Sequence, residues 1–191
     1  MDKSAFILII IFAAVAAVSL LLFTSEQTTP SPSPTPTQTP TQEIFSFEEC
    51  VKAGNPVMES FPGQCRANGQ TFTEDIGNVL EKEDVIQIDT PRPNQAIESP
   101  LEISGQARGT WFFEAQFPVR LKNIQGEVIA EGAAQAQGNW MTEDFVPFEA
   151  TLMFTVPETE DGTLILEKAN PSGLPENEEE LRVPVRFEPL Q

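Results

Sequence analysis

The chain has 191 residues and a formal net charge of −18, from 29 acidic and 11 basic side chains. This balance argues against a nucleic-acid partner, because nucleic-acid phosphates are bound mainly by Lys and Arg. The sequence contains no His, which removes the commonest general base and metal ligand, and its two Cys are too few for an ordinary zinc site. We therefore expect neither a metal nor a cofactor.

An apolar segment near the N-terminus predicts a membrane anchor. Residues 5–23 carry no charged side chain, and about 20 apolar residues span a bilayer as a helix. A cleaved signal peptide is the alternative, but its apolar core is usually shorter and is followed by small residues, which here lie inside the apolar run. Lys3 precedes the segment and no basic residue follows before Lys52. The positive-inside bias thus predicts a single-pass cell-membrane protein, with residues 1–23 as anchor, a cytoplasmic N-terminus and an extracytoplasmic bulk.

Residues 24–43 form a connection rich in Pro, Thr and Ser. The segment has few apolar side chains to bury, so we expect it to be disordered, with extended polyproline-like character. At about 3.1 Å per residue it would hold the next module up to roughly 60 Å from the membrane. This length fits a stalk that crosses a cell-wall layer, and it also fits a tolerated spacer.

Residues 44–75 are predicted to form a small module with a structural disulfide. A short helix ending at Val51 is expected before a run of helix-breaking residues. Cys50 and Cys65 are the only Cys in the chain, and outside the membrane an isolated pair predicts a disulfide. Closing a loop of about 15 residues contributes roughly 3 kcal/mol in the chain-entropy model. A redox or metal role is the weaker alternative, because the spacing is not Cys-x-x-Cys.

Residues 84–191 contain several segments in which apolar and polar side chains alternate, which predicts an all-β domain. Turn signals separate these segments, and Asp161-Gly162 is a strong hairpin signal. About seven short strands with no helical period are typical of an immunoglobulin-like β-sandwich. The predicted strands are 85–88, 101–107, 110–122, 127–131, 148–156, 163–168 and 181–187.

The predicted strand 110–122 is the longest of the seven. One of its faces is apolar and the other is mostly polar. Phe112 breaks this pattern, because it falls on the polar face beside Glu114 and Gln116, so the alternation predicts an exposed aromatic ring. Pro118 lies on the same face and lacks an N–H, which implies an edge, a bulge or a bend. The predicted buried face consists of Trp111, Phe113, Ala115, Phe117, Val119 and Leu121.

Several motifs occur in a fixed order between Ile86 and Phe187, among them NQAIESPLEISGQARGTWFFEAQFPV, GNWMTEDFVPFEATL, LILEKANPSG and VPVRF. With these motifs the segment resembles the immunoglobulin-like domain of bacterial spore germination proteins. The resemblance implies a β-sandwich in a membrane-tethered or secreted bacterial protein. The preceding module, with FEEC, GNPVMES and QCR, resembles a two-cysteine module of predicted bacterial surface proteins. Neither resemblance supplies catalytic or ligand-binding residues.

Exposed aromatic side chains are the candidates for a binding site. Phe112, with Glu114 and Gln116 beside it, and Trp140, which follows a turn, are suited to stack on a sugar ring or to insert into a protein. The alternative is that a neighbouring loop, such as 171–175, covers Phe112. We hypothesise a membrane-anchored extracytoplasmic protein whose immunoglobulin-like domain binds a protein or a cell-wall partner.

The carboxylates leave two further hypotheses open. Glu143-Asp144 and residues 158–161 suggest an acid/base pair or a calcium site, but without EF-hand spacing they fit solvated turns better. A cell-envelope glycan hydrolase needs two carboxylates and no His, so it remains an alternative, as does a purely structural spacer domain. We predict that the chain is not an enzyme.

Overall fold

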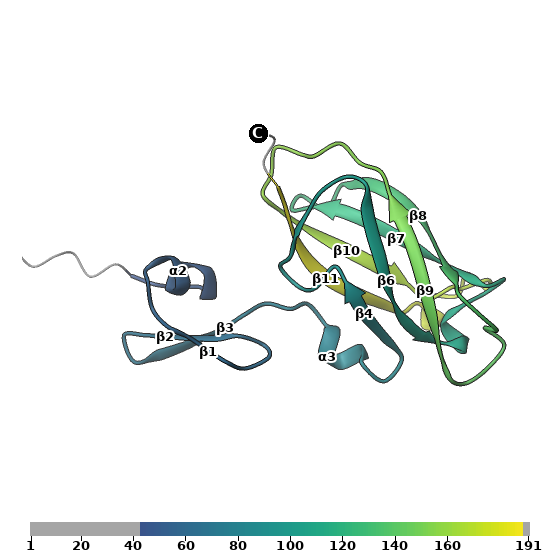
Figure 1. The fold of residues 1–191 in the computed structure, drawn as a ribbon, viewed down its shortest axis with the longest axis horizontal. Helices are drawn as coiled ribbons and strands as arrows, with labels where there is room; N and C mark the ends of the chain where they lie inside the picture. The colour runs from purple at the N-terminus through teal and green to yellow at the C-terminus, as the bar shows by residue number, and fades with distance from the viewer. Residues whose placement is uncertain (1–42, 189–191) are drawn as a thin grey trace, which may run out of the picture. The chain divides into compact units, whose positions relative to one another are not determined.

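A computed structural model describes residues 43–188 of the chain (Figure 1). The predicted anchor 1–23 and all but the last residue of the predicted linker 24–43 lie outside the described residues. Between residues 43 and 188, no helix is long and apolar enough to cross a bilayer. This part of the chain is mostly β, with a three-stranded sheet followed by an eight-stranded one.

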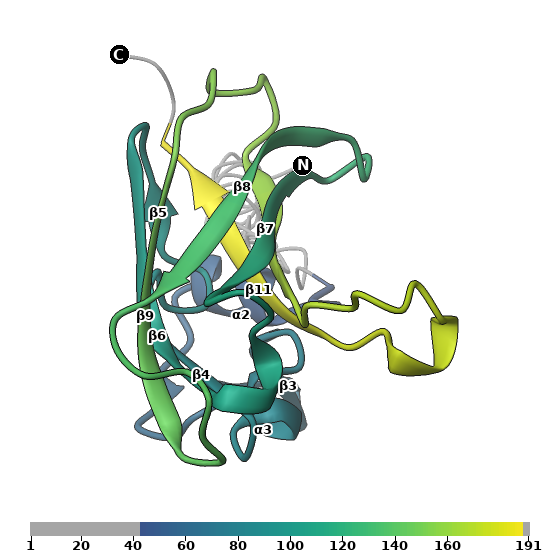
Figure 2. The ribbon, with the colours of Figure 1, turned by 90° about the vertical axis from the view of Figure 1, so that its right-hand side faces the viewer.

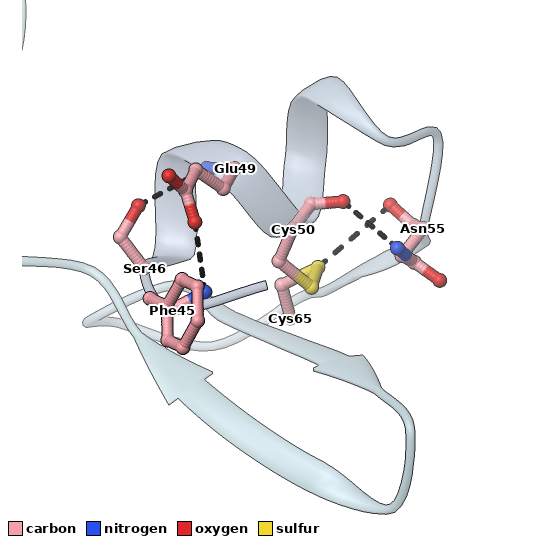
Figure 3. Close-up of a disulfide and its surroundings, with 6 residues drawn as sticks. All are labelled: Phe45, Ser46, Glu49, Cys50, Asn55 and Cys65. Atoms are coloured by element: carbon pink, nitrogen blue, oxygen red, sulfur yellow. Dashed lines mark hydrogen bonds between the residues drawn. A yellow bond between two sulfur atoms is a disulfide. The ribbon is translucent and has the colours of Figure 1, made fainter. Parts of the chain in front are cut away.

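The two-cysteine module begins with helix α2 (Phe47–Lys52), which confirms the predicted short helix. The Ser46 hydroxyl accepts a hydrogen bond from the Glu49 N–H at 3.1 Å, and the Glu49 carboxylate accepts one from the Phe45 N–H at 2.8 Å (Figure 3). Reciprocal bonds of this kind resemble a capping box, which is why the helix begins here. The antiparallel sheet of the module contains β1 (Val57–Met58), β2 (Gln64–Ala67) and β3 (Gln70–Thr73).

Cys50 and Cys65 form the predicted disulfide, which joins α2 to β2 (Figure 3). Both Cys are fully buried and, with Ala67, make up the buried core of the module. Larger apolar side chains, such as those of Phe45 and Phe61, are exposed. Because the module has so few buried side chains, the covalent link carries much of its stability.

The eight-stranded sheet curls so that its strands face each other across one core (Figure 2). The order is β4-β6-β9-β8-β7-β10-β11-β5, and all neighbours are antiparallel except β11 and β5. The strands are β4 (Ile86–Thr90), β5 (Ala96–Ile97), β6 (Leu101–Arg108), β7 (Gln116–Asn123), β8 (Val128–Ala136), β9 (Phe145–Leu152), β10 (Asp161–Glu167) and β11 (Glu180–Phe187).

The core is built from alternate residues of the facing strands. In β6, β9 and β11 buried and more exposed positions alternate as predicted. The rings of Phe117 on β7 and Phe148 on β9 meet edge to face, with centroids 5.0 Å apart. Trp111 is buried in the same core cluster. Contacts of this kind add specific geometry to the burial of apolar surface.

The predicted strands lie at about the right places in the chain, but several of their bounds differ from those observed. β8 continues to Ala136 through small residues that carry no apolar alternation, and β5 was not predicted. The hairpin predicted at Asp161-Gly162 is wrong, since both residues lie in β10, which pairs with β7 and β11 and not with β9. Gly162 has a packing reason instead: a Cβ there would lie 2.6 Å from the Phe187 ring.

The first half of the predicted strand 110–122 is also wrong. Phe113 and Gln116 exchange backbone hydrogen bonds of 3.0 and 3.1 Å, and so close a two-residue turn. Within it Glu114 and Ala115 have φ values of 52° and 61°, the left-handed conformation that type I′ hairpin turns require at both positions. A period of two cannot continue through such a turn, so β7 begins only after it.

The turn exchanges the predicted environments of two Phe residues. Phe112 is 5% exposed, with its ring 5.2 Å from that of Phe117, whereas Phe113 is 46% exposed. Trp111 is buried as predicted, but it belongs to the 3-10 helix η1 (Gly109–Trp111) and not to a strand. The prediction that Phe112 points outward is therefore wrong, because the chain coils through η1 where an extended strand was assumed.

Pro118 has the structural reason that its missing N–H implied. The ladder between β7 and β10 ends at the pair Val119–Leu166. Pro118 lies one residue beyond that end of the ladder, so its missing N–H removes no hydrogen bond between β7 and β10.

Candidate functional site at the loop end

Three connections of the curled sheet meet at one end. Because β6 runs antiparallel to β9, and β7 runs antiparallel to both β8 and β10, their connections emerge together. These are residues 109–115 between β6 and β7, 137–144 between β8 and β9, and 168–179 between β10 and β11. We call these three segments the loop end. Connections held by a rigid sheet are where binding residues are most often found.

Backbone hydrogen bonds tie each neighbouring segment to residues 109–115. The N–H of Ala169 donates to the Trp111 carbonyl at 3.0 Å, and the N–H of Ala136 donates to the Ala115 carbonyl at 2.8 Å. On the other side, the Gly109 N–H donates to the Asp144 carbonyl at 3.2 Å. Residues 109–115 are therefore hydrogen-bonded to both of the other connections or to the strand next to them.

Gly109 lets the loop 137–144 lie close to the backbone of residues 109–115. A Cβ at that position would lie 1.9 Å from the Thr142 carbonyl oxygen and 2.3 Å from that of Trp140. No side chain fits within those distances, so glycine is required. Two of the motifs noted in the sequence, RGTWFF and GNWMTED, therefore meet in space for a structural reason.

Phe112, Glu114 and Trp140 of the four predicted binding residues belong to the loop end, and Gln116 follows it as the first residue of β7. Glu114 and Gln116 are exposed at the turn, and Trp140 is half-buried against the core. The Gln116 side chain accepts a hydrogen bond of 3.0 Å from Gln135. Phe112 is not exposed with them, because its ring is part of the core.

The exposed apolar side chains of the loop end are others than those predicted. They are Phe113 at 46%, Met141 at 75% and Leu174 at 49% exposure, one from each connection. Sequence reasoning missed Phe113 because Glu-Ala carries no turn signal of the Asn-Gly kind. A Met beside Trp140 and a Leu in a Pro-rich loop carry no periodic pattern either.

A polar groove of about 1230 Å³ lies beside the loop 168–179, on the outer side of β7, β10 and β11. Ion pairs line it. Lys82 of helix α3 (Val79–Lys82) lies 2.8 Å from Glu179, and Lys168 lies 3.3 Å from the same carboxylate. Hydrogen bonds from these ammonium groups, Lys82 first, hold the pKa of Glu179 below its ordinary value, against the effect of burial.

Glu179 does not have the property that the acid of a glycan hydrolase needs. A glycan hydrolase needs a carboxylic acid with a raised pKa, whereas the carboxyl group that the two Lys contact is shifted the other way. Asp144, of the predicted carboxylate pair Glu143-Asp144, accepts a hydrogen bond from the Thr142 hydroxyl in an exposed turn. Within residues 43–188, no three Cys, Asp or Glu side chains are grouped closely enough to hold a metal ion.

Comparison with protein-family models gives a match within the eight-stranded sheet. Residues 85–173 match the family model Gmad2, described as the immunoglobulin-like domain of bacterial spore germination. The match begins just before β4 and ends in the loop that leads to β11. No curated protein and no solved structure matches the chain. Residues 85–173 therefore belong to the family of immunoglobulin-like domains of bacterial spore germination.

Proposed function

We propose that this protein is a binding module of the bacterial cell envelope, which its N-terminal segment anchors in the membrane and whose loop end contacts a protein partner outside the cytoplasm. The observation that carries the proposal is the exposure of Phe113 on a turn with two residues in the left-handed conformation. A non-glycine residue in this conformation destabilises the fold by about 1 kcal/mol, and strained backbone conformations of this kind are found most often at functional sites.

The neighbouring side chains support a protein partner. Phe113, Met141 and Leu174 place one exposed apolar group on each connection, and the half-buried Trp140 packs against the core. Aromatic rings surrounded by polar groups are typical anchors of protein interfaces. Glu114 and Gln116 provide the polar surroundings in this proposal.

The anchoring half of the proposal rests on the sequence. The uncharged apolar run 5–23 is long enough to span a bilayer, and the only basic residue near it precedes it. Protease treatment of intact spheroplasts tests this half: digestion of residues 43–191 from outside is expected, and full protection would contradict it.

Site-specific photocrosslinking of the full chain in its native membranes tests the loop end. A benzophenone side chain at position 113 is expected to give a discrete crosslinked protein. The same group at position 153 is the matched control, because Met153 is 72% exposed and follows the opposite end of β9. Equal crosslinking at both positions, or none at 113, would contradict the proposal.

Substitution of Phe113 measures how much this side chain contributes to the affinity for the partner. Replacing an aromatic anchor usually costs more than 1 kcal/mol, so Phe113→Ser should weaken capture of the crosslinked partner about tenfold. Met153→Ser should leave capture unchanged. A Phe113→Ser chain that captures the partner as well as the wild type does would remove Phe113 from the interface.

A further inference from the structure

Within residues 43–188, the edge of strand β8 that faces β9 is unpaired over most of its length. On one side β8 pairs with β7 from Val128 to Gln135, whereas on the other it meets β9 only through Gln135–Glu149 and Ala136–Phe148 (Figure 2). The N–H of Ala136 donates toward β7, and backbone groups alternate sides along a strand. Gly132 and Ala134 therefore bond to β7, while the N–H and C=O groups of Glu131 and Ala133 point away from it.

The two terminal strands of the sheet, β4 and β5, are protected in ways that β8 is not. β4 carries a bulge between Ile88 and Thr90 and is followed by Pro91, and β5 has only two residues. Bulges, prolines, basic residues and shortness are the usual means of preventing strand addition. β8 has nine residues and contains no Pro, Lys or Arg.

We infer that this edge of β8 accepts an extended, basic segment of another protein as an added strand. Unpaired backbone groups in a row are satisfied best by an extended polypeptide, which supplies donors and acceptors at the same spacing. The side chains along the edge are small, with Ala133 and Gly132 both exposed, so they leave room for the side chains of the added strand. This site is distinct from the loop end and does not depend on it.

Charge decides the kind of occupant. The Glu131 side chain is 74% exposed, and its nearest cation is Arg120, at 3.8 Å. Glu149 of β9 is exposed across the gap. Carboxylates on both sides favour Lys or Arg in the added strand. A second copy of this chain fits poorly, because antiparallel pairing centred on Glu131 would place two carboxylates together and each chain carries a net charge of −18.

Amide exchange of the full chain in detergent micelles tests the inference. The probe is a synthetic peptide of about six residues, the ordinary length of a strand, with Thr and Lys alternating. Binding is expected to slow exchange of the Glu131 and Ala133 amides about tenfold or more, because each becomes hydrogen-bonded. The same peptide with every backbone nitrogen methylated cannot pair as a strand and should have no effect.

Two variants of one position separate strand addition from charge attraction. Ala133→Pro removes an outward N–H and should abolish the slowing at Glu131, whereas Ala133→Ser keeps the N–H and should preserve it. Three results would overturn the inference: peptide binding that leaves exchange at Glu131 unchanged, equal binding of the methylated peptide, or slow exchange that depends on protein concentration without peptide. The last result would assign the edge to a second copy of the chain.

Discussion

The outer edges of β11 and β8 belong to the same sheet but differ in how their backbone groups are satisfied. Along β11, the Arg182 N–H donates to the side-chain oxygen of Asn78 at 2.7 Å, and the Asn78 amide donates to the Glu180 carbonyl at 3.0 Å. The Arg186 N–H donates to Gln95 at 3.0 Å. Along β8, Glu131 and Ala133 have no such partners among the strands of the sheet.

Proline completes the cover of β11. Pro184 has no N–H, and its carbonyl accepts a hydrogen bond of 2.7 Å from the Asn94 N–H, so this outward position on β11 offers no donor. This chain thus closes one edge with a side chain, a proline and a short strand, while it leaves the other edge available. An edge left open in such a sheet is a candidate for binding.

Gly77→Ala is expected to have the largest effect on the covered edge. Gly77 has φ +67°, and a Cβ there would lie 2.1 Å from the Arg182 carbonyl oxygen. The substitution must displace the connector from β11, so we expect a loss of about 3 kcal/mol or more in the free energy of unfolding. Denaturant titration followed by Trp fluorescence measures it.

Gly126→Ala is the matched control for this prediction. Gly126 also has a positive φ, of +83°, but a Cβ added there would meet no atom within 4 Å beyond its chain neighbours. Only backbone strain remains, so we expect a loss of about 1 kcal/mol. Equal effects of the two substitutions would show that the contact between Gly77 and Arg182 does not hold the connector in place.

Asn78→Ala is expected to have the next largest effect, about 2 kcal/mol, because it leaves the Arg182 N–H and the Glu180 carbonyl without their partners. Asn78→Asp keeps the acceptor for the Arg182 N–H but turns a second carboxylate oxygen toward the Glu180 carbonyl, so it should destabilise the fold as well. The same titration measures both variants. If Asn78→Ala is neutral, water satisfies this edge as well as the side chain does.

Ala133→Pro should cost at most about 1 kcal/mol, because the N–H that it removes has no partner within the sheet. Ala134→Pro, one residue further on, removes a donor to β7 and introduces a ring into the core, so its cost should exceed about 3 kcal/mol. Thermal unfolding compares the two variants. Equal losses would mean that both N–H groups are bonded and that the edge is not open.

The smallest expected effect is the dependence of stability on pH through Glu179. Its pKa is lowered from 4.5 in the folded state, so its ion pairs stabilise the fold above about pH 4.5, and this contribution is lost as pH falls through the folded pKa. Glu179→Gln should cost less than about 1 kcal/mol near neutral pH and nothing in acid. Glu176→Gln is the control. If Glu179→Gln lowered the free energy of unfolding equally at neutral and at acidic pH, the prediction would be contradicted.

Much of the fold could be predicted from the sequence, because buried and more exposed residues alternate in β6, β9 and β11. The disulfide followed from two Cys in an otherwise coreless module. The candidate site was harder to predict, since a tight turn at Glu114-Ala115 carries no characteristic residues and moves Phe112 into the core. The open edge of β8 could not be predicted, because hydrogen bonding between strands depends on which strands become neighbours, and the small residues after Glu131 show no pattern.

Amide hydrogen exchange along β8 of the free full chain tests the contrast between the two edges most directly. If β8 is open, the Glu131 and Ala133 amides exchange at least about a hundredfold faster than those of Gly132 and Ala134, while the Arg182 and Arg186 amides of β11 are protected. Protection of Glu131 and Ala133 equal to that of their neighbours, at every protein concentration, would contradict the account.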